Sequence, residues 1–388
     1  MKRLAVVTSH PIQYNAPWFK LLANEEGIQL KVFYTWEQSA GGNTFDPGFG
    51  KKITWDIPLL EGYEFSFTKN VSDNPGTHHF KGIITPFLNA EIEQWKPDAL
   101  LIIGWSFDSH LHCLRHFHKK VPVIFRGDST LLDEKPGWRR IIRRISLRWV
   151  FSYIDHALYV GTNNKQYFLK HGLKESQLEF APHAIDNERF SNGADVFEEE
   201  ALKWRRELGL GTDEVVVLFA GKFEPKKNPF FILQLADRLK DHNITFLLIG
   251  NGPLEASLKE SAKDNARVRF MDFQNQGRMP LVYRLGDVFI LPSTGPGETW
   301  GLAINEASAC SRPVMVSNKV GCAIDLVHQD KNGIIFSSDD IERCVEFLTR
   351  LVHDKDRIKH MGSYSRQIIY QYSFYHLIEG VKKIIQKL

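Results

Sequence analysis

Two glutamates, Glu298 and Glu306, bracket the segment ETWGLAINE, with seven mostly small or apolar residues between them. The apolar run at 288–291 and the loop with Pro and Gly after it predict a buried parallel strand that enters a loop. A helical pattern starts at Leu302, so Glu298 should lie where the loop ends and Glu306 one to two turns inside the helix. Open α/β sheets bind anionic ligands where a strand's carboxyl end meets a helix N-terminus. The segment therefore predicts a site for a phosphate-bearing ligand.

Lysines gather after another predicted strand. The run VVVLFA leads into GKFEPKKNP, in which Gly221 allows a turn and Lys222, Lys226 and Lys227 follow. Ammonium groups at this strand end, beside a helix N-terminus, could neutralise a departing diphosphate. Taken alone the segment is more typical of a solvated basic loop, but together with the glutamates it favours a phosphate site.

The motifs GKFEPKK, IGNGP and DVFILPS and the paired glutamates, in this order, resemble the retaining glycosyltransferases of the GT-B fold, family four. The resemblance covers most of residues 215–335. It implies that Glu306 holds the ribose hydroxyls of a nucleotide-sugar donor and that Glu298 contacts the donor sugar. The family's phosphate-binding Arg and Lys fall on Lys222 and Lys227. A lysine thus replaces the arginine, which retains the charge but loses the planar guanidinium.

The same resemblance implies that residues around these motifs complete the donor site. Backbone amides near Trp300 would cradle the diphosphate and the sugar. The further donor-binding candidates are Thr299, Trp300, Gly301, Gly221, Gly252, Phe273 and His10.

The N-terminal half supplies the remaining catalytic candidates. Arg126 and Asp128 follow a predicted strand in VIFRGDS, where Arg126 could bind phosphate or acceptor and Asp128 could orient it. An interdomain salt bridge is the alternative. Family members often carry a Gly-Gly loop after the first strand, whereas this chain has SHPIQYN. His10 in that loop would face the cleft of the fold, although a His before a Pro is also a common turn residue.

Short apolar runs alternate with amphipathic helical stretches along the whole chain, which predicts an α/β fold with two doubly wound parallel sheets. The polar stretch 186–213 shows no strand signal and is interpreted as the connection between them. The resemblance implies a GT-B architecture. Residues 1–190 would form a Rossmann-like acceptor-binding domain, completed by a C-terminal helix at 370–388 that crosses back to it. Residues 191–369 would form the Rossmann-like donor-binding domain.

Composition narrows the function class. The chain has 388 residues with 49 basic and 46 acidic side chains, a net charge of +3, which is too balanced for a nucleic-acid binder. The four cysteines lack the short paired spacing of a disulfide framework or zinc knuckle. The N-terminus shows no signal-peptide core. We therefore expect a cytoplasmic protein that needs no metal and no cofactor.

The segment WRRIIRRISLRWV at 138–150 predicts a basic amphipathic helix. Trp138, Ile141, Ile142 and Ile145 share one face, and arginines occupy the rest. A core-packed helix with a solvated arginine face is the favoured interpretation. Peripheral contact with an anionic membrane, at the inner membrane face, is the alternative.

The resemblance implies a retaining enzyme that transfers a sugar from a nucleotide-diphosphate sugar to a hydroxyl. The donor is expected to be a UDP-sugar rather than a GDP-sugar, and the lysines would make the enzyme independent of metal. The acceptor would be a saccharide or a lipid-linked molecule, in surface polysaccharide or glycolipid assembly. A nucleotide-sugar epimerase on the same fold and a non-catalytic nucleotide-sugar binding protein are the alternatives.

Overall fold

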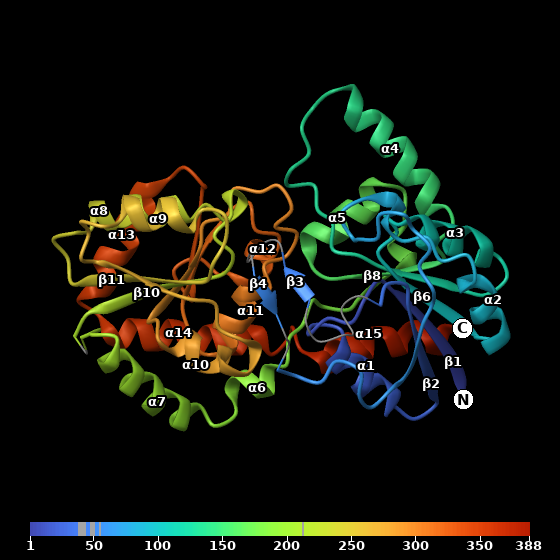
Figure 1. The fold of residues 1–388 in the computed structure, drawn as a ribbon, viewed down its shortest axis with the longest axis horizontal. Helices are drawn as coiled ribbons and strands as arrows, with labels where there is room; N and C mark the ends of the chain where they lie inside the picture. Colours follow the sequence, from blue (N-terminus) through green and yellow to red (C-terminus); the bar gives the residue numbers. More distant parts are fainter. Residues whose placement is uncertain (38–43, 47–50, 54–55, 212) are drawn as a thin grey trace. The chain divides into compact units, whose positions relative to one another are not determined.

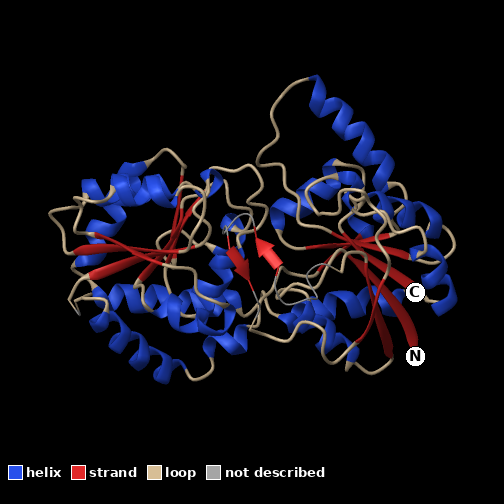
Figure 2. Ribbon diagram, viewed as in Figure 1, coloured by secondary structure: helices blue, strands red, loops and turns tan. Residues whose placement is uncertain are grey.

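The chain divides into two compact units in a computed structural model that describes residues 1–37, 44–46, 51–53, 56–211 and 213–388. Unit 1 comprises residues 1–44, 53–183 and 374–388, and unit 2 comprises residues 45–52 and 184–373. In each unit helices flank a parallel sheet (Figure 2). Two doubly wound sheets were predicted from the alternation of apolar runs, and this fold class is confirmed.

The sheet of unit 1 has seven strands in the order β5-β2-β1-β6-β7-β8-β9, all paired in parallel (Figure 1). Its strands are β1 (Lys2–Thr8), β2 (Ile28–Tyr34), β5 (Glu64–Phe67), β6 (Ala99–Ile103), β7 (Val123–Arg126), β8 (His156–Tyr159) and β9 (Leu178–Phe180). Its longer helices are α1 (Ala16–Ala23), α2 (Leu88–Trp95), α3 (Asp108–Phe117), α4 (Trp138–Phe151) and α5 (Thr162–Lys170). A separate two-stranded sheet pairs β3 (Thr44–Asp46) with β4 (Lys51–Ile53).

The sheet of unit 2 has six strands in the order β12-β11-β10-β13-β14-β15, again parallel. They are β10 (Val215–Ala220), β11 (Ile244–Ile249), β12 (Val268–Met271), β13 (Val288–Leu291), β14 (Val314–Ser317) and β15 (Gly333–Phe336). The helices are α6 (Asn187–Ser191), α7 (Ala194–Glu207), α8 (Pro229–Arg238), α9 (Glu255–Ser261), α10 (Met279–Arg284), α11 (Leu302–Ala309), α12 (Ala323–Leu326), α13 (Ile341–Val352) and α14 (Lys355–Ile369).

The central strands β10, β11 and β13 are apolar except at Thr245, because helices cover both faces of the sheet of unit 2. Every residue of β10 and β11 is buried, and so are all four residues of β13. Continuous runs of this kind are typical of parallel strands. They explain why the sequence identified these strands well.

The C-terminal helix α15 (Phe374–Lys387) returns to unit 1, as the resemblance implied. It packs on α1 and β9. Lys382 pairs with Glu25 of the α1–β2 turn at 2.8 Å, and Lys387 pairs with Glu179 of β9 at 3.1 Å. Gly380 is required at the contact, because a Cβ there would lie 2.2 Å from the Phe180 carbonyl oxygen.

One interpretation of the sequence is wrong, and a second is right only in part. The stretch 186–213 is not a bare connection, because it forms α6 and α7, which pack on α10 and α11 inside unit 2. Helix α4 does pack on the core, as favoured, but through Leu147, Val150 and Phe151 and not through the face that the sequence indicated. That face is exposed at Trp138, Ile141, Ile142 and Ile145, because only the C-terminal half of the helix lies on the body of unit 1.

No helix within the described residues is both long enough and apolar enough to span a bilayer.

Candidate functional site

The loops that follow the strands of unit 2 meet at the carboxyl edge of its sheet. The Phe223 N–H after β10 donates to the Asn251 carbonyl after β11 at 3.0 Å, and the Leu254 N–H donates back to the Phe223 carbonyl at 3.0 Å. The Thr294 N–H after β13 donates to the Lys226 carbonyl at 2.9 Å. Three motifs that lie far apart in the sequence therefore form one cluster.

Close packing explains two of the candidate glycines. A Cβ on Gly252 would lie 2.6 Å from the Phe223 carbonyl oxygen. Gly301, which has φ 99°, adopts a conformation that other residues rarely take, and a Cβ there would lie 2.6 Å from Val320 Cγ1. Gly221 differs, since a Cβ there would make only ordinary contact with the Phe219 ring at 3.5 Å. Packing therefore leaves room for a side chain at position 221 and does not by itself require glycine there.

Lys227 and Glu298 form a short ion pair at the centre of the cluster. The Lys227 Nζ lies 2.5 Å from Glu298 Oε2, and the two side chains are only 18% and 8% exposed. Ser293 Oγ donates to the same carboxylate oxygen at 3.2 Å. Lys222 lies in the same loop as Lys227 and is partly buried. The structure thus joins a residue expected to bind phosphate to one expected to contact sugar, and a bound diphosphate would compete with Glu298 for Lys227.

The backbone of the Glu298–Gly301 segment is held by the loop after β14. The Gly321 N–H donates to the Glu298 carbonyl at 3.0 Å, and the Cys322 N–H donates to the Trp300 carbonyl at 2.9 Å. A Cβ on Gly321 would lie 1.7 Å from the Thr299 carbonyl oxygen. The sequence reasoning missed Gly321, although a glycine soon after β14 was a signal for close approach.

Trp300 is buried beside the start of α11, where its indole N–H donates to Asn305 Oδ1 at 2.9 Å. Gly301 directly precedes α11, so the segment ends at a helix N-terminus, whose unpaired N–H groups and dipole favour an anion. Thr299, Trp300 and Gly301 therefore lie next to the start of α11, and their donor-binding roles stay predictions.

Glu306 lies on α11 and is almost fully buried. Tyr283 of α10 donates its hydroxyl hydrogen to Glu306 Oε2 at 2.6 Å. The Tyr283 ring packs edge-on against Phe190 and Phe289. This tyrosine, which the sequence reasoning missed, holds the carboxylate that was predicted to bind ribose.

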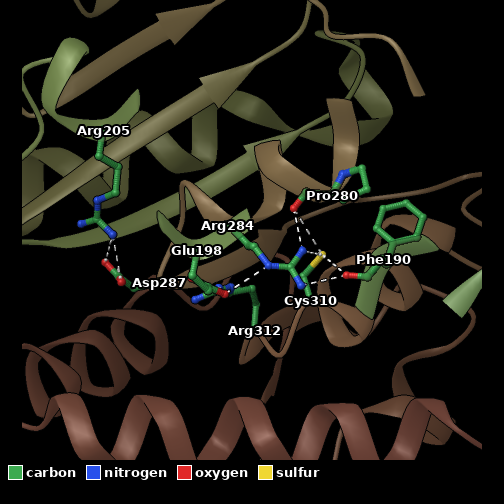
Figure 3. Close-up of polar contacts among 8 residues, drawn as sticks. All are labelled: Phe190, Glu198, Arg205, Pro280, Arg284, Asp287, Cys310 and Arg312. Atoms are coloured by element: carbon green, nitrogen blue, oxygen red, sulfur yellow. Dashed lines mark hydrogen bonds and ion pairs between the residues drawn. The ribbon is translucent and has the colours of Figure 1, made fainter. Parts of the chain in front are cut away.

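An ionic network around the buried Arg284 links the helices that carry Tyr283 and Glu306 (Figure 3). Arg284 of α10 lies 3.2 Å from the Glu198 carboxylate of α7, which also accepts a hydrogen bond from Arg312. Arg284 donates to Cys310 Sγ, just after α11, at 3.2 Å. Because burying an unpaired arginine is costly, α7, α10 and α11 must keep this arrangement.

Further contacts of Figure 3 anchor the same helices. Arg284 also donates to the carbonyls of Pro280 and Phe190, each at 2.8 Å. One guanidinium nitrogen of Arg205 on α7, Nη1, donates to both carboxylate oxygens of Asp287 at 3.1 Å, and Asp287 accepts from the Val216 N–H at 2.8 Å. Asp287 directly precedes β13, so α7 is tied to the strand that leads to Glu298.

Asn251 connects the Phe273 candidate to the cluster. The Phe273 N–H donates to Asn251 Oδ1 at 3.0 Å, and Asn251 Nδ2 donates to Asp272 at 3.1 Å and to Glu255 at 2.8 Å. Phe273 follows β12, so the Asn251 side chain links the loop after β11 to the loop after β12. Asn251 belongs to the GNGP motif, but no local pattern indicates this role for its side chain.

Arg126 and Asp128 lie in unit 1, at the carboxyl end of β7. The buried Arg126 guanidinium donates to the carbonyls of Ala181 at 2.7 Å and Pro182 at 2.9 Å, both in unit 1. Burial lowers its pKa to about 10, and Asp128 acts in the opposite direction. Asp128 lies 3.8 Å from His183 Nε2. The contacts seen for Arg126 are thus structural, and the acceptor roles of Arg126 and Asp128 stay predictions.

His10 follows β1 in unit 1, at the same sheet edge as Arg126. Its Nδ1 lies 2.9 Å from Ser9 Oγ, and its ring meets Trp36 edge-on at 5.3 Å. Burial lowers its pKa to about 4, so the ring is neutral at neutral pH. A donor-binding role for His10 stays a prediction.

The chain contains one Asp-x-Asp triplet, at 354–356. Asp354 caps α14 by accepting from the Arg357 N–H at 2.8 Å, which accounts for its position. Within the residues that the structure describes, no three His, Cys, Asp or Glu side chains gather in a way that could hold a metal ion.

Comparison with known proteins agrees with this arrangement. The family model Glycosyl transferases group 1 matches residues 200–368, which confirms the resemblance found in the sequence. The sulfoquinovosyl transferase SQD2 of Arabidopsis thaliana is 25% identical over 304 residues, which are 75% of this chain and 57% of that protein.

A GDP-mannose-dependent alpha-(1-6)-phosphatidylinositol monomannoside mannosyltransferase of Mycobacterium tuberculosis is 25% identical over 60% of this chain and 61% of its own length. The chain thus spans about three fifths of these relatives. Among solved structures, HepE of Anabaena in complex with UDP and glucose is 15% identical, covers 100% of both chains and superposes with a TM-score of 0.71. This likeness confirms the fold.

Proposed function

We propose that this protein, whose residues 200–368 belong to the glycosyl transferases group 1 family, transfers a sugar from a nucleotide-diphosphate sugar to a hydroxyl acceptor. The observation that carries the proposal is the Lys227–Glu298 pair, 2.5 Å apart, at the N-terminus of α11. Such a site could bind a sugar diphosphate. The lysine and the helix N–H groups would bind the phosphates, and the carboxylate would accept hydrogen bonds from the sugar hydroxyls.

Charge stabilisation would supply most of the catalysis. As the bond between sugar and diphosphate breaks, negative charge grows on the diphosphate, and Lys222, Lys227 and the N–H groups at Gly301 would stabilise it. The departing oxygen would take the proton of the acceptor hydroxyl. Bond breaking and bond formation would then occur on one face of the sugar, so that its anomeric configuration is retained. The reaction would need no metal, because the lysines carry the required positive charge.

Glu306 would bind the ribose of the donor, with Tyr283 holding its carboxylate in place. We propose a UDP-sugar as the donor. HepE, which shares the fold, binds UDP and glucose, whereas the mannosyltransferase relative is GDP-mannose-dependent. The family resemblance supports a nucleotide sugar of either base.

The acceptor is proposed to be a saccharide or a lipid-linked molecule in surface polysaccharide or glycolipid assembly. A phosphatidylinositol mannoside is the acceptor type in the name of one relative, which supports the lipid-linked class. Unit 1, with Arg126 and Asp128, would bind it. The four cysteines are buried and free of disulfides, which suits a reducing cytoplasm.

A donor panel tests the proposal. Thermal shift with UDP-, GDP- and ADP-sugars identifies the donor, because a ligand that binds only the folded state raises Tm. Incubation of that donor with acceptor mixtures should release the nucleoside diphosphate, and NMR of the product should show the donor's anomeric configuration. Lys227→Ala is the matched variant and should release far less.

Two outcomes would contradict the proposal. Interconversion of the donor sugar without any acceptor would indicate an epimerase. Donor binding without release of the nucleoside diphosphate in the presence of any acceptor would indicate a non-catalytic binding protein.

A further inference from the structure

Helix α4 carries an apolar stripe that faces away from the core of unit 1. Trp138, Ile142, Ile145 and Trp149 recur with the spacing i, i+4, i+7 and i+11, so they lie on one side of the helix. Ile141 extends the stripe. Trp138 is 66% exposed, Ile145 65% and Trp149 44%. Contiguous large apolar side chains on a surface mark an interaction site.

The orientation of the stripe is fixed by the other side of the helix. Leu147, Val150 and Phe151 are buried in the core of unit 1. Leu147 lies two residues from Ile145 and from Trp149, about half a turn of helix away. The stripe therefore points opposite to the core, and α4 stands out from the rest of unit 1 in Figure 1.

The rest of α4 is positively charged. The helix contains five arginines, at 139, 140, 143, 144 and 148, and no acidic residue. None of these arginines forms an ion pair with any residue that the structure describes. Arg139 lies over the Trp138 ring at 5.5 Å, beside the stripe. Arg139 and Arg148 are exposed and lie about a quarter turn to either side of the stripe. Arg140, Arg143 and Arg144 lie toward the opposite side, where Arg143 donates to the Tyr167 hydroxyl at 3.5 Å. The helix thus combines an exposed apolar stripe with flanking arginines that no ion pair to a described residue neutralises.

We propose that α4 is a docking surface for an anionic lipid bilayer, on which the stripe enters the headgroup layer and the arginines bind lipid phosphates. Charge and shape select this partner. A second copy paired about a two-fold axis would bring this arginine-rich surface against itself, where the charges repel. Tryptophans at Trp138 and Trp149, at the two ends of the stripe, suit the boundary between headgroups and acyl chains.

Vesicle co-sedimentation of the full chain tests the proposal. The protein should sediment with phosphatidylcholine vesicles that contain phosphatidylglycerol and not with phosphatidylcholine alone. Raising the salt concentration should weaken the binding, because ions screen the arginines. Absence of binding to the anionic vesicles at low salt would overturn the proposal.

Matched variants show whether vesicle binding depends on α4 or on non-specific adsorption of the protein. Arg139→Gln with Arg148→Gln should weaken binding about twentyfold or more, from about fivefold for each basic residue near an anionic surface. Ile141→Ser with Ile145→Ser should weaken it at least tenfold, because two buried side chains are lost.

The controls carry the same chemical changes at exposed positions in unit 2. They are Arg206→Gln with Arg343→Gln for charge, and Val196→Ser with Leu202→Ser on α7 for apolar area. Both controls should bind as the unaltered chain does. Equal binding by the α4 variants, or loss of binding in the controls, would overturn the proposal. So would a dimer in sedimentation velocity that Ile141→Ser with Ile145→Ser abolishes, because the stripe would then bind a second copy.

Lipid binding by α4 does not depend on the transfer reaction. Lys227→Ala, which should lose activity, should still sediment with anionic vesicles. Conversely, the α4 variants should keep their turnover of a water-soluble acceptor. Failure of the lipid proposal would therefore appear only in the vesicle assay, and failure of the proposed transfer only in the activity assay. Loss of vesicle binding in Lys227→Ala would contradict the assignment to α4.

Discussion

Replacing Glu306 with glutamine should weaken donor binding and leave the chemical step almost intact. The buried Glu306 carboxylate accepts from Tyr283 at 2.6 Å, and a glutamine amide oxygen can still accept that bond. What the variant loses is the charge that would bind ribose hydroxyls. A hydrogen bond to a charged group contributes about 1.5–3 kcal/mol, so donor KM should rise roughly tenfold to a hundredfold. Because ribose does not change during the reaction, kcat should fall much less.

Initial rates at varied donor concentration and saturating acceptor measure the two constants. Tyr283→Phe is the companion variant, because it keeps the Glu306 charge and removes only the group that holds it. We expect a smaller rise in donor KM for Tyr283→Phe than for Glu306→Gln. Thermal unfolding without donor shows whether either chain is still folded. An unchanged donor KM in a folded Glu306→Gln protein would mean that ribose is bound elsewhere.

Three further predictions concern other groups. Lys222→Ala and Lys227→Ala should each lose about two to three orders of magnitude in kcat, with a smaller change in donor KM, because both lysines would face the charge that grows as the diphosphate leaves. A near-normal kcat in both variants would show that the phosphates lie elsewhere. Sugar transfer should continue in excess EDTA, and full loss of activity that Mn²⁺ restores would contradict the lysine assignment. Burial lowers the pKa of His110, which contacts Gly104 and Thr35, to about 4, whereas an unfolded histidine titrates near 6.5. The unfolded chain therefore binds the extra proton first, and about 3 kcal/mol of unfolding free energy should be lost as the pH falls from about 6.5 to 4; urea titrations of the unaltered chain and His110→Gln should show a shallower loss in the variant.

The sheets and the donor motifs could be predicted because the signals are local. A parallel strand buried on both faces needs a continuous apolar run, as in β10, β11 and β13, and the turn after it needs glycine. The short edge strands β5, β9 and β15 were missed. Length is not the reason, since β13 also has four residues. β5 (EFSF) and β9 (LEF) contain no buried residue and no continuous apolar run, and the apolar run of β15 (GIIF) is only three residues long.

The partners of the candidate side chains could not be predicted, because they depend on how distant segments pack. Lys227 and Glu298 are 71 residues apart, and Tyr283 and Glu306 are 23 apart. Nothing in either local sequence indicates the other member of the pair. The same holds for Arg126, whose guanidinium was available for a ligand on sequence grounds and is instead bound to two carbonyls from a loop about 55 residues later.

Helix α4 shows most directly what its own sequence determines and what packing adds. Its amphipathic pattern and its five arginines are properties of the chain, and they were visible at once. Two apolar faces were nevertheless available, one with Ile141 and Ile145 and one with Leu147 and Val150. Hydrophobic periodicity shows that a face is apolar, but it does not show which face meets the core, because that depends on the shape of the surface beneath. In the fold the second face is buried and the first is left exposed.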